Sequence, residues 1–94
     1  MPTDTGSDMR VLEVRNVHRD QVPLYYRMNY VALAVMEFPL GTSEIPIHFS
    51  VEMDPLGRKT FEVFLDEPID YPIFPVLRDL QTCIAKMDSE GVLT

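Results

Sequence analysis

The stretch SVEMDPLGRKTFEV, Ser50–Val63, decides the fold because it has the pattern of a complete β-hairpin. Apolar and polar side chains alternate on both sides of a Pro-Leu-Gly tip, which is the period of a strand with one buried face. The same alternation begins upstream, at Ile45. The predicted inward set is Ile45, Ile47, Phe49, Val51 and Met53 before the tip, and Phe61, Val63 and Leu65 after it.

The register of this hairpin follows from its side chains. Pairing Val51 with Phe61 sets apolar residues opposite apolar ones, whereas a slip of one residue would move a whole set to the wrong face. The predicted turn then consists of Asp54, Pro55, Leu56, Gly57 and Arg58, with Asp54 and Arg58 closing it. Such a loop places a type I turn before a left-handed residue, and the proline and the glycine stand where these conformations are needed.

Two further segments upstream are apolar enough to be strands. Residues 10–18, RVLEVRNVH, mix charge on both faces, which is typical of an edge strand. Residues 23–37 are ambiguous, because their apolar residues fit a helical repeat as well as a strand. Their tyrosine and valine content and the strands on either side favour a strand, and a helix at 23–37 stays open as the alternative.

A helix is predicted from Pro72 or Pro75 to Glu90, and Gly91 is a favourable end for it. Its predicted apolar stripe is Ile73, Leu77, Leu80, Ile84 and Met87, with Val76 and Cys83 at the margins. The chain is therefore predicted to be an α+β protein, a four-stranded antiparallel β-meander with one C-terminal helix packed on one face. The alternative is a βαββα order. Residues 1–8 are expected to form a flexible acidic tail and residues 9–94 a single domain.

Composition excludes several classes of function. The net charge is −7 and the excess lies beyond residue 30, so binding to a phosphate backbone is not expected. The longest apolar run, Tyr30–Met36, is too short to cross a membrane. The polar start does not resemble a signal peptide, and the single Cys83 cannot form an internal disulfide. These features favour a cytoplasmic protein.

The sequence offers little for catalysis. Phosphate-binding glycine loops, paired cysteines and a Gly-x-Ser-x-Gly motif are absent, so we expect neither cofactor nor metal and no enzyme activity. The acidic residues of the hairpin are expected to be solvated. One alternative remains, a small-ligand enzyme or sensor centred on His48 and Glu62, with Ser50 on the same face, because a carboxylate can orient a histidine base.

A single helix can cover only one face of the sheet, and the chain has more aromatic residues than that core can bury. Exposed apolar surface of this kind marks association. The predicted interface residues are Tyr25, Val31, Leu33, His48, Phe64 and Tyr71. We therefore expect a small non-catalytic protein-interaction module, such as an adaptor, a regulatory subunit or a chaperone-like protein, that binds itself as a homo-oligomer or binds another protein.

The segment PIFPVLRDLQTCIAKMDSEGVL, Pro72–Leu93, resembles the first helix of the SecB-type export chaperones. The residues that carry the resemblance are Phe74, Pro75, Arg78, Cys83, Ile84 and Gly91. The resemblance implies a tetrameric chaperone that holds unfolded chains in hydrophobic grooves, and an acidic four-stranded meander before the helix fits that family. The chain departs from it in lacking the long crossover loop before the helix and everything after the helix.

Overall fold

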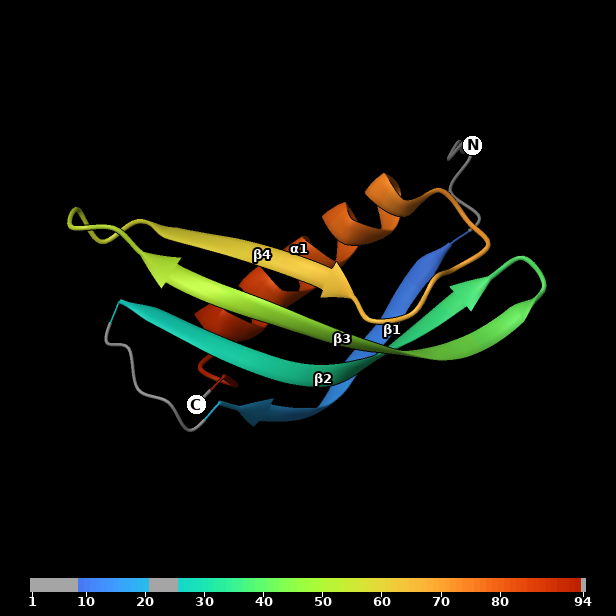
Figure 1. Cartoon of the computed structure of the whole chain (residues 1–94), viewed down its shortest axis with the longest axis horizontal. Coiled ribbons are helices and arrows are strands. Elements are labelled where there is room, and N and C mark those ends of the chain that lie inside the picture. Colours follow the sequence, from blue (N-terminus) through green and yellow to red (C-terminus); the bar gives the residue numbers. More distant parts are fainter. Residues whose placement is uncertain (1–8, 21–25, 94) are drawn as a thin grey trace.

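The computed structural model describes residues 9–20 and 26–93 and contains one sheet and one helix. The elements are β1 (Arg10–Arg19), β2 (Arg27–Phe38), β3 (Gly41–Met53), β4 (Lys59–Leu65) and α1 (Ile73–Ser89). The strands form an antiparallel sheet in the order β1-β2-β3-β4 (Figure 1). The predicted α+β meander with one C-terminal helix is thus confirmed. The tail predicted for residues 1–8 lies outside the described residues.

The ambiguous segment is a strand, so the helical alternative is wrong. Tyr30, Ala32, Ala34 and Met36 are buried on one face of β2, and this alternation has the period of a strand. β2 pairs with β1 on one side and β3 on the other. Its two-faced apolar character is that of a central strand, which explains why periodicity alone left the segment ambiguous.

The hairpin has the predicted register and turn. Val51 pairs with Phe61, and Glu52 and Ser50 pair with Thr60 and Glu62. Gly57 has a φ of 84°, the left-handed conformation that a side chain would disfavour. The Asp54 N–H donates to the Arg58 carbonyl at 2.9 Å, and the Asp54 carboxylate accepts the backbone N–H groups of Leu56 and Arg58, each at 2.9 Å.

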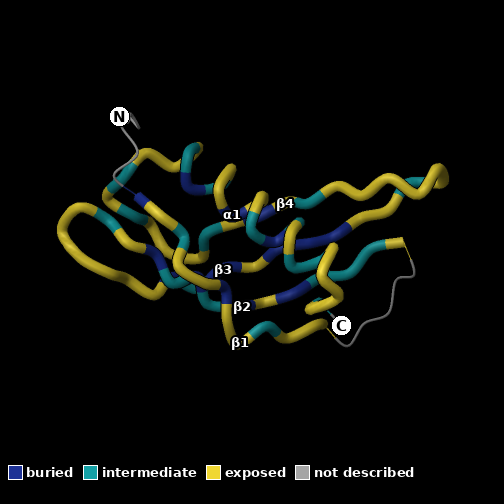
Figure 2. The backbone as a smooth tube through the Cα atoms, turned by 180° about the vertical axis from the view of Figure 1, so that it is seen from behind, coloured by how far each residue is buried: buried dark blue, intermediate teal, exposed yellow. Residues whose placement is uncertain are grey.

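Helix α1 crosses one face of the sheet obliquely and contacts β1 and β4 (Figures 1 and 2). Val76, Leu80 and Ile84 are fully buried, so the helix faces the sheet along these residues. The prediction for Leu80 and Ile84 is confirmed. The prediction for Ile73 is wrong: this residue is 45% exposed, because the first turn of α1 projects past the edge of the sheet (Figure 1).

The end of α1 is the predicted one. Gly91 has a φ of 75° and donates its N–H to the Asp88 carbonyl at 3.1 Å. The Val92 N–H donates to the Met87 carbonyl at 3.0 Å. These two bonds form a Schellman motif, which satisfies carbonyls that the helix end leaves without partners.

The core lies between α1 and the sheet, and Phe49 is its largest fully buried side chain. Its ring stacks on Tyr30, with ring centroids 4.9 Å apart. We expect Phe49→Ala to lower the free energy of unfolding by about 3–5 kcal/mol, because the substitution leaves a cavity between sheet and helix. Chemical denaturation measures this. Leu56→Ala, at an exposed turn position, is the control and should change stability by less than about 0.5 kcal/mol. Equal effects of the two would contradict this core.

The turn gives the hairpin an acid-sensitive contact. The backbone N–H of Arg58, followed by the Arg58 side chain and the Leu56 and Gly57 N–H groups, lowers the pKa of Asp54 below its usual 3.8. A carboxyl whose pKa is lowered in the folded state stabilises that state above the usual pKa, and the contribution is lost as pH falls through the folded value.

We therefore expect Asp54→Asn to destabilise the protein at pH 7 and to show a smaller further loss than the wild type below about pH 4. Thermal unfolding followed by circular dichroism at both pH values measures the two losses. A wild type and an Asp54→Asn variant that lose stability in parallel on acidification would show that this carboxylate does not stabilise the turn.

Candidate functional site

The sheet surface opposite α1, here called the open face, has no secondary-structure element over it in the described chain (Figures 1 and 2). The strand registers set His18 opposite Val31, Val31 opposite His48, and His48 opposite Phe64. These residues form one row across all four strands, here called the central row. Val31 is 53% exposed and Phe64 is 46% exposed, so the row presents apolar surface to solvent.

His48 is held by two neighbours. Its ring stacks on Phe64, with ring centroids 4.8 Å apart and an interplanar angle of 16°. Its Nδ1 lies 2.5 Å from Oδ1 of Asp66. The carboxylate expected beside His48 was that of Glu62, and this expectation is wrong. Both acids lie diagonally across from His48, but Glu62 points toward Arg27, with Arg27 Nη2 at 3.9 Å from Glu62 Oε1.

Two ion pairs cross over a strand and cover parts of the open face. The Arg27–Glu62 pair joins β2 to β4 across β3, and Ser50 beneath it is only 4% exposed. The Arg15–Glu44 pair joins β1 to β3 across β2. It passes between the register positions of Leu33 and Val35, which are half-buried.

The predicted exposure of Leu33 is therefore only partly realised. The long arginine side chains cover apolar surface with their stems while their charged ends stay wet. Between the two spanning pairs, the central row is left uncovered. The exposed apolar surface is consequently narrower than the sequence predicts.

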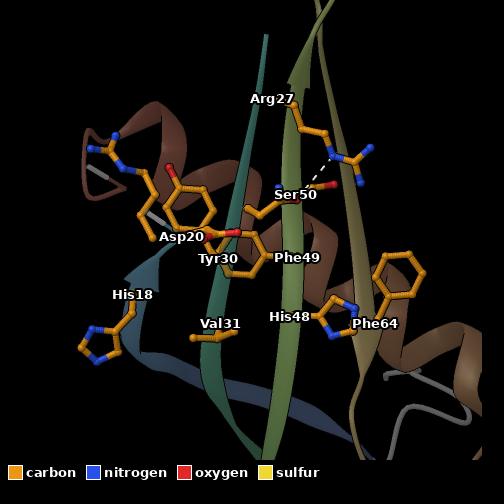
Figure 3. A pocket seen from close by; sticks show the side chains of 11 residues that line it. His18, Asp20, Arg27, Tyr30, Val31, His48, Phe49, Ser50 and Phe64 are labelled. Carbon is orange, nitrogen blue, oxygen red and sulfur yellow. Dashed lines mark hydrogen bonds between the residues drawn. The ribbon is translucent and has the colours of Figure 1, made fainter. Parts of the chain in front are cut away.

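The uncovered surface is an open depression of about 590 Å³ (Figure 3). Its rim combines the central row with polar and charged groups. The lining residues outside the row that matter here are Arg19, Asp20, Arg27, Asn29 and Ser50. Arg27 Nε donates to Asn29 Oδ1 at 3.3 Å, which turns the arginine along the wall of the depression (Figure 3).

Two predicted interface residues are not part of this surface. Tyr71 lies in the connection between β4 and α1, where its ring lies 5.3 Å from that of Phe38 and packs against the core. Its aromatic character was assigned to the interface because sequence alone could not place the connection. Tyr25 lies outside the described residues.

The structure contains little that would support catalysis. Ser50, the predicted companion of His48, is buried beneath the Arg27–Glu62 pair. Burial raises the pKa of the Cys83 thiol, which disfavours the reactive thiolate. Within residues 9–20 and 26–93, no group of three or more His, Cys, Asp or Glu side chains could hold a metal ion.

The molecule is thus a small α+β domain with one covered and one open sheet face. Residues 8–89 match the sequence model of the BB_0187 family, and the chain belongs to that family. No curated protein and no solved structure matches the chain. In the part of the chain that the structure describes, no helix is long and apolar enough to cross a membrane. The resemblance to SecB-type chaperones stays a prediction.

The stack of His48 on Phe64 has a spectroscopic consequence. Ring current from Phe64 should move the ring-proton resonances of His48 upfield from those of His18, which has no aromatic neighbour among the described residues. Phe64→Ala should abolish the difference without unfolding the protein, because position 64 is half exposed. Proton NMR measures this. Identical His48 shifts in the wild type and the variant would contradict the stacked arrangement.

Proposed function

We propose that this chain is a small, non-catalytic, cytoplasmic protein-interaction module that binds another protein, or a copy of itself, through the open face. The observation that carries the proposal is the central row. It places exposed Val31 and Phe64 on a rigid sheet, with polar groups around them. An apolar centre with a polar rim is the usual composition of a protein interface.

The edges of the sheet favour the face as the docking surface. Edge strands can pair with another chain, and bulges or side chains over the edge prevent this. β1 has register shifts between Val11 and Glu13 and between Arg15 and His18, and Asn16 within it has a φ of 56°. Such irregularities bend a strand and interrupt a flat row of backbone groups.

The free edge of β4 is partly occupied by the helix. Asp66 donates its N–H to the Pro46 carbonyl, so alternate residues bond to β3 and Phe61, Val63 and Leu65 turn their backbone groups outward. Gln81 Nε2 on α1 donates to the Phe61 carbonyl at 2.9 Å. With both edges protected, contact through the face is the arrangement that remains.

The apolar area available supports modest but specific binding. Full burial of a valine or phenylalanine side chain contributes about 1.5–3 kcal/mol, and burying the exposed half of each contributes roughly half of that. The two residues together thus supply a few kcal/mol, and the polar rim adds specificity. This is the scale of a transient partner rather than of an obligate subunit.

A small-ligand enzyme or sensor is the second candidate, because the His48–Asp66 contact could orient an imidazole base over the depression. The burial of Ser50 counts against nucleophilic catalysis. His48→Ala discriminates between the two functions. An interaction module keeps its fold and most of its affinity for a partner, whereas an enzyme centred on this imidazole loses its activity.

Phe64→Glu tests the proposal. A charge in the central row should disrupt binding, because the carboxylate must lose its water when the face is covered. We expect the variant to lose its co-purifying proteins or to fall to the monomer mass, with the hairpin still formed. Light scattering on a sizing column, with analysis of bound proteins, measures both. The matched control is Phe74→Glu, at a 79% exposed position on α1 away from the open face.

The proposal fails if Phe64→Glu keeps the mass and partners of the wild type. It fails equally if Phe74→Glu is the variant that loses them, since the binding surface would then lie on the helix side. Circular dichroism of each variant shows whether the fold is kept.

A further inference from the structure

The cations of this acidic chain gather at the depression. The net charge is −7, yet the depression is lined by Arg19, Arg27 and both histidines of the sequence. The acids that face it are Asp20 on the rim and Glu62, which lies 3.9 Å from Arg27. A local excess of basic groups in an acidic protein selects an anionic ligand at that place.

The arginines retain donors for such a ligand. Among the described residues, neither Arg19 nor His18 forms an ion pair. Arg27 uses Nε for Asn29, and 3.9 Å to Glu62 is too long for a hydrogen bond. The terminal nitrogens of Arg27 can therefore donate to an incoming carboxylate, and charge-assisted bonds of this type are about twice as strong as neutral ones.

Apolar surface lies directly beside these donors. Val31 and the stacked rings of His48 and Phe64 continue the depression along the central row. The row crosses four strands, which are about 4.8 Å apart, so its length is about 14 Å. An extended chain rises about 3.3 Å per residue, so about four or five residues span the row. Residues two apart in such a segment point to the same side and can place a carboxylate and an apolar side chain on the sheet together.

We infer that the partner contributes a short extended segment in which Asp or Glu stands near an apolar residue, and that this segment lies along the central row with its carboxylate on Arg27 and Arg19. The inference rests on the proposed function and names the chemistry of the partner. The two spanning ion pairs, Arg27–Glu62 and Arg15–Glu44, flank the segment. A phosphate-rich partner fits less well, because the rest of the chain is acidic and would repel it.

The test is selection from a displayed library of random peptides of roughly eight residues on the immobilised full chain. Wild type, Phe64→Glu, Arg19→Gln, Arg27→Gln and the control Arg78→Gln, whose side chain is exposed on α1, are selected in parallel. We expect wild type and Arg78→Gln to enrich peptides with Asp or Glu near an aromatic or aliphatic residue. The most enriched peptide should bind Arg27→Gln about tenfold more weakly, and should weaken with salt.

Three results would overturn the inference. Enrichment of neutral or basic peptides that still need Phe64 would contradict the acidic partner and leave the proposed function standing. Enrichment that survives Phe64→Glu would contradict both. No enrichment, together with a wild-type dimer that Phe64→Glu dissociates, would identify a second copy of the chain as the occupant. Thermal unfolding of each variant confirms that the fold is kept.

Discussion

The structure depends on one geometric constraint, which is that a single helix cannot cover both faces of a four-stranded sheet. α1 has 17 residues, so it is about 26 Å long, and it packs on one side through Val76, Leu80 and Ile84. The core is therefore concentrated between α1 and the inward residues of the strands. The opposite face must remain soluble without a covering element, and its side chains reflect this requirement.

Charged side chains keep most of the open face wet. Arg15 with Glu44 and Arg27 with Glu62 reach across a strand and shield apolar or small residues beneath them. Exposed ion pairs contribute little to stability, so their effect here is mainly to limit the exposed apolar area. The central row is left between them. A narrow apolar row with protected sheet edges suits selective contact and discourages uncontrolled aggregation.

The sequence predicted what local patterns determine. The hairpin register followed from alternation, and Pro55 and Gly57 independently required the same turn, so the two signals agreed. The fold class followed from the order of such segments, although the central strand β2, apolar on both faces, could not be distinguished from a helix by period alone. Leu80 and Ile84 were placed correctly because helical spacing is local as well.

Contacts distant in the sequence could not be predicted in the same way. Arg15 and Glu44 are 29 residues apart, and only the assembled sheet brings them together over Leu33 and Val35. The choice of Asp66 over Glu62 beside His48 likewise depends on where Arg27 points. Tyr71 and Ile73 were misplaced because the path of the connection before α1 is set by packing.

The most direct test of the account places a photo-crosslinking phenylalanine analogue at position 64 of the full chain, in the cells that make it, with position 74 as the comparison. Both positions are exposed, but only the first lies on the open face. The account predicts discrete protein adducts from position 64 and none in common from position 74. Adducts from position 74 with none from position 64 would contradict it, because the binding surface would then lie on the helix side.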